Sequence, residues 1–409
     1  MIEAACLAAA AAALYCYAGY PLLIRGIAAL AGADPPQAPP GWTPPTVSIL
    51  IAAYDEETTI AGKIRGCCAL EHPAGRMEIV IVSDGSADRT VSRAREAAAA
   101  APAGTRVLVL EDPRRRGKAL CINDAAAAST GDVLVFTDAN SRLGTDSLRW
   151  LLAPFSDPRT GCVVGELEYE NTGDPAVRRG EGLYWRYDNA IKQAESRLGR
   201  AITANGGLYA LRRNLFAPLP PHLSGDALDP LRALCAGYRC WFERRARAAE
   251  RAAESFREEY GRKLRITTHG LQAWVLLRGL LWPPRPLLAW EYFSHKLLRW
   301  VMPAILAAWL AGLVLLALPW PALPRLFPLA VWRGALGAAL LFLLLAAAGL
   351  LLERRGARTG APGPAGRLAL VCGYFVVVNA AAAMSLLHVV GGVTLPTWEK
   401  SASTRPAGS

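Results

Sequence analysis

Two aspartates and one lysine in the first third of the chain have the chemistry of a phosphate-binding site. Asp84 closes an apolar run that begins at Ile79, and Asp138 follows a second run that begins at Val133. Short runs of this kind predict buried parallel strands, and ligands in open α/β sheets lie beyond the carboxyl ends of such strands. Lys118 lies between the two aspartates in a basic, glycine-marked segment. Two carboxylates and an ammonium group at one sheet edge are suited to holding a metal-bound phosphate.

The elements that must position these residues alternate regularly. Expected strands are followed by segments of helical character, for instance the helix expected from Lys118 to Ala128. This alternation predicts an α/β fold with a mostly parallel sheet and right-handed crossovers. Beyond Asn140 the pattern loosens into a less regular half, with a partly helical stretch from Arg178 to Leu198, that could hold an acceptor. Strands are expected at residues 47–53, 79–82, 106–110, 133–136, 162–165 and 207–211.

Four segments without Asp, Glu, Lys or Arg are each long enough to cross a hydrocarbon core of about 30 Å as a helix. With 53% apolar residues, the whole chain is too apolar for a purely soluble protein. Four transmembrane helices are therefore predicted. The first is expected to be an uncleaved anchor, because the start of the chain lacks a basic n-region. The segments are residues 4–24, 301–320, 334–352 and 368–395.

Arginines predict the orientation in the membrane. Arg25 follows the first apolar segment, and four arginines (Arg354, Arg355, Arg358 and Arg367) lie between the third and the fourth. Cytoplasmic loops carry an excess of Lys and Arg, so we expect a multi-pass protein of the cell (inner or plasma) membrane with its middle block in the cytosol. The expected parts are an anchor at 1–32, a Pro-rich linker at 33–46, a cytosolic catalytic domain at 47–283, an interfacial helix at 284–300, three transmembrane helices within 301–395 and a tail at 396–409.

The formal net charge of +11 does not indicate nucleic acid as a partner. The basic residues are dispersed, and no nucleic-acid-binding motif occurs. Positive-inside bias and contact with anionic membrane lipid account for the excess. The nine cysteines show no metal-ligand spacing, so we assign them no role.

Six short motifs follow one another along the chain, at Ser48–Glu57, Val82–Ser86, Gly117–Ala119, Phe136–Asn140, Gly225–Asp226 and Arg299–Trp300. In type and order they resemble the membrane-bound inverting glycosyltransferases of family 2, in the branch of the cellulose, chitin, hyaluronan and poly-N-acetylglucosamine synthases. The expected transmembrane helices flank them as in that family. The resemblance implies a GT-A fold and hexosyl or N-acetylhexosaminyl transfer. The donor would be a UDP-sugar, and the acceptor a polysaccharide or a lipid-linked sugar.

The resemblance also implies roles at the sheet edge. Asp84 would bind the uracil of the donor, and Asp138 would bind Mg²⁺ or Mn²⁺ bridging the diphosphate. Two simpler readings stay open, since Asp84 could cap the next helix and Lys118 could belong to a solvated basic loop. The donor-binding residues that the family pattern implies are Tyr54, Glu56, Asp84, Lys118, Asp138, Asn140, Arg299 and Trp300.

Asp226 matches the general base of the family. Inverting transfer needs one carboxylate to take the proton of the acceptor hydroxyl, while the nucleoside diphosphate leaves from the opposite face. The simpler reading is an N-cap for a helix near Asp229.

Arg299 would stabilise the departing diphosphate, and Trp300 would stack on the acceptor sugar. Both could instead be ordinary interface anchors before a transmembrane helix. Lys263 and Arg265 could lie near the donor as part of a gating loop, or form a lipid-facing basic strip.

Three positions depart from the family pattern. Asn140 stands where the family has a second metal-binding aspartate, Gly225 replaces the first member of an acidic pair, and Lys296 replaces a glutamine. These departures would suit an alternative, a catalytically impaired partner that binds a nucleotide-sugar. A second alternative is a lipid-phosphate sugar synthase, since such enzymes share the nucleotide half but usually lack the Arg-Trp motif. Four spans are few for a translocation pore, so a partner could complete one.

Overall fold

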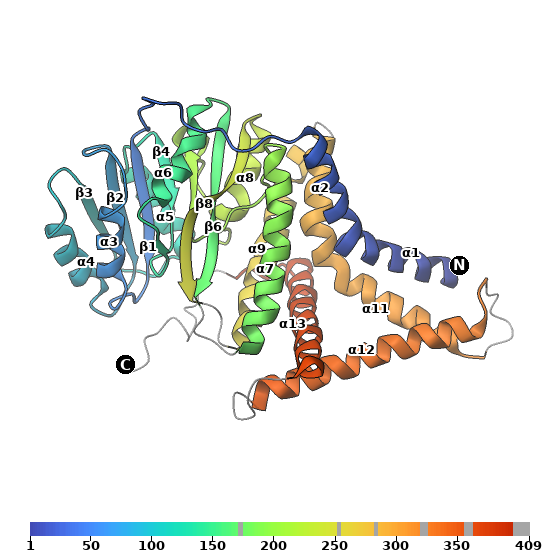
Figure 1. Ribbon diagram of the computed structural model, residues 1–409. Coiled ribbons are helices and arrows are strands. Elements are labelled where there is room, and N and C mark those ends of the chain that lie inside the picture. Colours follow the sequence, from blue (N-terminus) through green and yellow to red (C-terminus); the bar gives the residue numbers. More distant parts are fainter. Residues whose placement is uncertain (171–174, 252–254, 282–284, 320–325, 356–362, 396–409) are drawn as a thin grey trace.

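The computed structural model describes residues 1–170, 175–251, 255–281, 285–319, 326–355 and 363–395. The predicted tail at 396–409 and Arg358 lie outside these residues. Figure 1 shows an α/β body and a set of long helices that extend from its side.

In the part of the chain that the structure describes, one sheet of eight strands forms the body, in the order β3-β2-β1-β4-β7-β6-β8-β5. Its first half is parallel, as expected, and consists of β1 (Val47–Ala53), β2 (Met77–Asp84), β3 (Arg106–Asp112) and β4 (Val133–Phe136). In the second half β7 runs antiparallel to both β4 and β6, whereas β6 and β8 are parallel to each other. These strands are β5 (Arg142–Leu143), β6 (Thr160–Glu170), β7 (Tyr209–Arg212) and β8 (Arg239–Arg251).

Helices cover both faces of this sheet, which explains the continuous apolar runs of its strands. On β1, Ile49 and Ile51 pack into the core beneath one face, and Leu50 and Ala52 into the core beneath the other. One face is covered by α3 (Ile60–Cys68), α4 (Thr90–Ala99) and α6 (Ser147–Leu152). The other is covered by α5 (Lys118–Ala128) and α8 (Gly225–Cys235). The predicted α/β fold with a mostly parallel sheet is confirmed.

Within the described residues, four helical runs are long and apolar enough to cross a membrane, at Ile2–Ala31, Pro286–Ala317, Leu329–Arg354 and Pro364–Val390. They contain α1 (Ile2–Leu14) and α2 (Tyr20–Ala31), α10 (Pro286–Tyr292) and α11 (Leu298–Ala317), α12 (Leu329–Arg355), and α13 (Pro364–Val390). Residues 286–300, which were predicted as part of a separate interfacial helix, continue without a break into α11. The orientation of these helices in a membrane stays a prediction.

Two further helices join the body to this set. They are α7 (Pro175–Arg197), which packs on α2, and α9 (Phe256–Leu281), which packs on α13 (Figure 1). Side-chain hydrogen bonds tie α9 to α13, from the Tyr374 hydroxyl to the Glu259 carboxylate (2.8 Å) and from the Ser385 hydroxyl to the Leu264 carbonyl (3.0 Å). The segment considered for a gating loop is therefore helical and joins the sheet to an apolar helix.

Candidate active site

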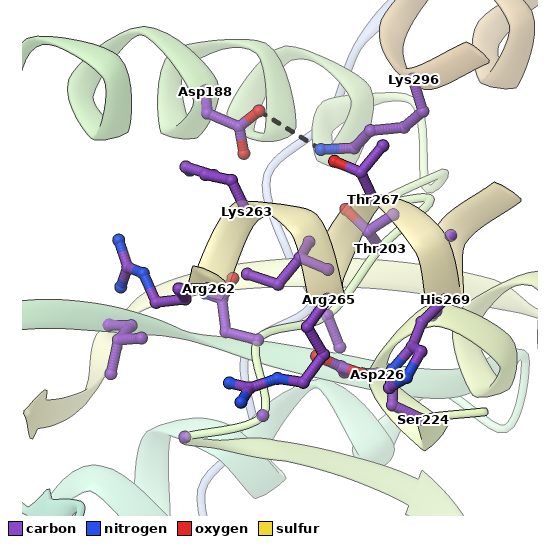
Figure 2. A pocket seen from close by; sticks show the side chains of 18 of the residues that line it. Asp188, Thr203, Ser224, Asp226, Arg262, Lys263, Arg265, Thr267, His269 and Lys296 are labelled. Atoms are coloured by element: carbon purple, nitrogen blue, oxygen red, sulfur yellow. Dashed lines mark hydrogen bonds and ion pairs between the residues drawn. The ribbon is translucent and has the colours of Figure 1, made fainter. Parts of the chain in front are cut away.

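A cavity of about 560 Å³, here called the junction cavity, lies where the sheet edge, α7, α8, α9 and α13 meet. Five of the predicted site residues line it, namely Lys118, Asp138, Asp226, Arg299 and Trp300. The other four, Tyr54, Glu56, Asp84 and Asn140, are not among its lining residues. In Figure 2, Arg265 and His269 extend from α9 toward Asp226, whereas Lys263 extends toward Asp188. The cavity thus has an end at the sheet and an end at the apolar helices.

Asp84 holds the basic segment in place. Its buried carboxylate accepts hydrogen bonds from the backbone N–H groups of Arg116 (2.6 Å) and Gly117 (3.0 Å). Gly117 has a φ of 96°, a conformation that glycine adopts readily, and Lys118 follows it as the first residue of α5. Asp84 therefore fixes the start of the helix that presents Lys118.

Tyr54 and Glu56 lie at the carboxyl end of β1, beside the same segment. The Arg115 guanidinium lies 4.0 Å from the centre of the Tyr54 ring. The buried Glu56 carboxylate accepts a hydrogen bond from the hydroxyl of Thr59, the residue just before α3. Glu56 thus supports the start of a helix, and the Tyr54 ring lies against the Arg115 guanidinium.

Lys118, Asp138 and Asp226 converge on the backbone of Gly206. Lys118 and Asp138 form an ion pair. A Cβ atom added to Gly206 would lie 3.3 Å from Asp138 Oδ2, 3.5 Å from Lys118 Nζ and 3.7 Å from Asp226 Oδ2. Burial acts to lower the pKa of Lys118, but the Asp138 carboxylate outweighs it and the pKa is raised, so the lysine stays charged. The structure brings together three side chains that the sequence places up to 108 positions apart.

Asp226 lies in the first turn of α8, where a negative charge is stabilised by the helix dipole. Ser224, and not Asp226, occupies the N-cap position. The helix therefore points the Asp226 carboxylate into the junction cavity, as a general base requires.

The structure explains why a glycine stands at position 225, where the family pattern has an acidic residue. A buried, hydrogen-bonded pair of side chains, Tyr209 and Asp229, leaves no room for a larger residue there. The Tyr209 hydroxyl donates a hydrogen bond to Asp229 Oδ2 (2.9 Å), and Asp229 is fully buried. A Cβ atom on Gly225 would lie 2.4 Å from the Tyr209 hydroxyl oxygen and 2.8 Å from Asp229 Oδ2. A larger residue at position 225 would displace this pair. The sequence analysis missed the pair, because the two residues belong to different elements.

The pair predicts a pH-dependent stability. Burial raises the pKa of Asp229 from 3.8 to about 7, against the lowering effect of the Tyr209 hydrogen bond. Because the folded-state pKa lies above the unfolded one, stability falls as the pH rises from about 4 to 7, and the full cost, about 4 kcal/mol, is present above pH 7. The asparagine side chain of Asp229→Asn carries no charge at any pH. The free energy of unfolding of this variant, relative to that of the wild type, should therefore rise between about pH 4 and pH 7. Unfolding curves at pH 4.5 and 8 in detergent check this, and parallel pH profiles for the two proteins would contradict it.

Glu250 is a second acidic residue that the sequence analysis missed. It accepts a hydrogen bond from the Ser141 hydroxyl and lines the junction cavity near the end of β8. Burial and the nearby Asp138 carboxylate raise its pKa. A Cβ atom on Gly207 would lie 2.8 Å from Glu250 Oε1. Gly207 is therefore close to Glu250, and its neighbour Gly206 is close to Asp138 and Asp226. No local pattern in the basic strand around Glu250 marks it as a site residue.

At the other end of the cavity, Arg299 binds Asp188 of α7. Arg299 Nη1 lies 3.1 Å from Asp188 Oδ1. Trp300 packs closely on α9, since a Cβ atom on Gly270 would lie 2.2 Å from its ring. The predicted Arg-Trp motif thus lines the cavity, and Arg299 is held by a carboxylate that the sequence analysis did not single out.

The residues present fit a divalent cation that takes most of its ligands from substrate and water. Asp138 supplies one carboxylate at the cavity, and Mg²⁺ in phosphate-binding sites commonly has only one or two protein carboxylates. Within the described ranges no cluster of three His, Cys, Asp or Glu side chains is placed to form an all-protein metal site. Asn140 lies outside the cavity lining, so ligation by Asn140 is not supported here.

The sheet and the helices on its two faces form an α/β fold of the GT-A type, and the junction cavity lies at the carboxyl end of its parallel half. A family model described as glycosyl transferase family 2 matches residues 48–218. These residues therefore form a glycosyltransferase family 2 domain.

Two curated relatives and one solved structure are similar to this chain. The chain is 24% identical over 295 residues to an N-acetylglucosaminyltransferase of Rhizobium meliloti (strain 1021), covering 68% of each chain. It is 29% identical over 189 residues to a beta-monoglucosyldiacylglycerol synthase of Synechocystis, covering 44% of this chain and 38% of that protein. A mannosyltransferase from Pyrobaculum calidifontis, solved with GDP-Man and Mn²⁺, shares the fold with a TM-score of 0.66 at 22% identity, over 94% of this chain and 99% of that one.

Proposed function

We propose that this protein is an integral membrane inverting glycosyltransferase that transfers a sugar from a UDP-sugar to an acceptor hydroxyl, with Asp226 as the general base. The observation that carries the proposal is the convergence of Asp226, Asp138 and Lys118 on Gly206 inside one cavity. A carboxylate beside an ammonium group and a second carboxylate is what proton abstraction next to a departing diphosphate requires.

The donor class is supported by the parallel half of the sheet and by relatives. One relative is named an N-acetylglucosaminyltransferase and another a glucosyldiacylglycerol synthase, so a hexosyl or N-acetylhexosaminyl group suits this chain. The choice of UDP follows the family resemblance. Tyr54 offers a ring at the carboxyl end of β1 on which a base can stack.

In this mechanism the acceptor hydroxyl loses its proton to Asp226 as its oxygen forms a bond to the anomeric carbon. The bond between that carbon and the diphosphate oxygen breaks on the opposite face, and its electron pair leaves with the nucleoside diphosphate. Lys118 stabilises the charge that develops on the diphosphate. Asp138 would hold a divalent cation, which would neutralise the same charge when bound.

A metal test follows from the position of Asp138. Asp138→Asn removes the one cavity carboxylate assigned to the cation, so the Mn²⁺-dependent affinity for UDP should fall about 10- to 100-fold. Titration calorimetry of UDP with and without Mn²⁺ measures this change. Asp132→Asn is a suitable control, since Asp132 bonds Thr46 at the opposite end of β4, outside the cavity. An unchanged Mn²⁺ dependence in the Asp138 variant would remove Asp138 from the metal site.

The acceptor is a polysaccharide or a lipid-linked sugar that reaches the cavity from the side of α13. We place the protein in the cell membrane, with the sheet in the cytosol. This placement is supported by four helices of spanning length and by the arginines that flank them. If the product is a long chain, a partner would have to complete its exit path.

The experiment that tests the proposed function measures nucleoside diphosphate release by the purified protein in native-lipid discs, against a panel of UDP- and GDP-sugars. One UDP-sugar is expected to give turnover that needs Asp226. Binding of a UDP-sugar without turnover for any donor would favour the alternative of a catalytically impaired partner.

A further inference from the structure

The end of the junction cavity at the apolar helices contains more cationic side chains than carboxylates. Asp188 on α7 accepts hydrogen bonds from Lys296 Nζ (3.3 Å) and Arg299 Nη1 (3.1 Å) and forms an ion pair with Lys192 (3.2 Å). It also bonds His295 Nε2 (3.1 Å). One carboxylate therefore serves three full positive charges, all of them buried or nearly so.

Arg299 has donors left over for a ligand. Its side chain is 9% exposed, and its Nε and Nη2 atoms have no hydrogen-bond partner among the residues that the structure describes. The Arg299 Cζ atom lies 5.2 Å from the centre of the Tyr187 ring and 5.9 Å from the centre of the Tyr184 ring. Contact of the guanidinium face with these rings leaves its edge for hydrogen bonding. Buried, unpaired N–H groups on a charged side chain are costly, so an anion that accepts from them would be strongly stabilised.

A π-helical turn at Phe293–Leu297 allows these cations to point the same way. It lies between α10 and α11 and brings His295, Lys296 and Arg299 to one aspartate. A second π-helical turn, Tyr15–Gly19, packs beside it, with Tyr15 Oη 2.8 Å from Ser294 Oγ. Such turns inside α-helices are frequent at functional sites.

The wall that α13 contributes to the same cavity is mostly apolar. Val371, Phe375, Val378 and Ala382 line the same cavity and lie within one of the candidate spans. Across the cavity, Lys263 Nζ lies 3.7 Å from the centre of the Tyr184 ring. A ligand here would meet positive charge at its head and hydrocarbon along its length.

The sugar donor is less suited to this end. Its nucleotide belongs with the carboxyl ends of β1 and β2, where Tyr54 and the segment held by Asp84 lie outside the cavity lining. Lys118 and Asp138 stand at the sheet end to receive the diphosphate. Arg299 and Lys296 are therefore available to a second anion.

We propose that the acceptor is a phosphate-bearing lipid with a free hydroxyl in its head group, and that Arg299 and Lys296 bind its phosphate. This inference rests on the proposed function and names its acceptor class. The head-group hydroxyl gives its proton to Asp226 and its oxygen bonds the anomeric carbon, while the nucleoside diphosphate leaves with the electron pair. The lipid phosphate takes no part in bond making and stays on the cations, with the lipid chain along α13.

The test compares acceptors for the wild-type protein in neutral-lipid discs, with the active donor. The probes are a polyprenyl-diphosphate-linked monosaccharide, the same monosaccharide on a neutral alkyl chain, a soluble oligosaccharide, and inorganic phosphate added as a competitor. The KM for the phosphate-bearing lipid is expected to be about 10- to 100-fold below the KM for the neutral lipid. Millimolar inorganic phosphate should compete for the cations and raise the KM for the phosphate-bearing lipid toward that for the neutral lipid. Equal KM values for the two lipids, or preference for the soluble oligosaccharide, would overturn the inference while leaving the proposed function intact. Absence of transfer to every probe, together with absence of nucleoside diphosphate release, would count against the proposed function itself.

Two variants locate the phosphate. Arg299→Gln and Lys296→Gln should each raise the KM for the phosphate-bearing lipid about 10-fold or more, with the donor KM and the KM for the neutral lipid unchanged. Arg200→Gln is the matched control, because Arg200 also pairs with a buried carboxylate, Glu291 (2.7 Å), but does not line the cavity. A rise in the donor KM instead would assign Arg299 to the diphosphate and overturn the inference. Lys296→Gln keeps the test valid if Arg299→Gln does not fold.

Discussion

Replacing Asp226 by asparagine is expected to lower turnover by a factor of about 10² to 10⁴ while leaving donor binding unchanged. Asparagine keeps the size and the position of the side chain in the first turn of α8 but cannot take the proton of the acceptor hydroxyl. Because Lys118 and Asp138 are untouched, the affinity for the nucleoside diphosphate should stay at the wild-type level. Release of nucleoside diphosphate measures the first quantity, and calorimetric titration with UDP measures the second.

Two controls make this result specific. Asp229→Asn changes a carboxyl three residues further along the same helix, which is buried behind Asp226 and does not line the cavity, so it tests for damage to α8. Asp226→Glu keeps a carboxylate and should recover part of the activity that asparagine loses. Turnover by Asp226→Asn within a few fold of wild type would show that another group is the base, and Glu250 would be the next candidate.

Replacing Asp188 by alanine is expected to destabilise the folded protein by about 3 to 5 kcal/mol. The change leaves Lys192, Lys296 and Arg299 close together without the carboxylate that joins them. Burial acts to raise the pKa of Asp188, but the neighbouring cations outweigh it and hold the pKa well below its usual range. The stabilisation is therefore present above pH 4 and is lost as the pH falls further, so the two proteins should become more alike in acid.

Denaturant unfolding in detergent at pH 7 and at about pH 2 measures this difference. Glu111→Ala provides the comparison, since its ion pair with Arg95 (2.9 Å) is exposed and is expected to contribute at most about 1 kcal/mol. If Asp188→Ala and Glu111→Ala lose similar stability, the cation group around Asp188 does not hold the helices together.

Much of the nucleotide half could be predicted from sequence, because its strands are short apolar runs with polar ends. The same pattern located Asp84 and Asp138, since each follows such a run. The role of Asp84 in holding Arg116 and Gly117 was not visible, because backbone contacts across 32 and 33 positions leave no periodic trace.

The other half of the site depended on contacts that no local pattern carries. Asp188 meets Lys296 and Arg299 across 108 and 111 positions, and the sequence predicted only a partly helical stretch around it. Gly225 was interpreted as the loss of an acidic neighbour. In the structure its missing side chain makes room for the Tyr209–Asp229 pair, which only the packing of α8 against β7 could show.

The bonds between α9 and α13 have a consequence for how the protein can be divided. Tyr374 and Ser385 on α13 hold the helix that carries Lys263 and Arg265, and residues of α11 and α13 form part of the cavity wall. A fragment of residues 33–281 would keep the whole sheet and Asp226, and it would lose the first candidate membrane helix, Arg299, Trp300 and the apolar wall. Such a fragment is expected to bind nucleotide as a soluble protein and to have no enclosed place for an acceptor.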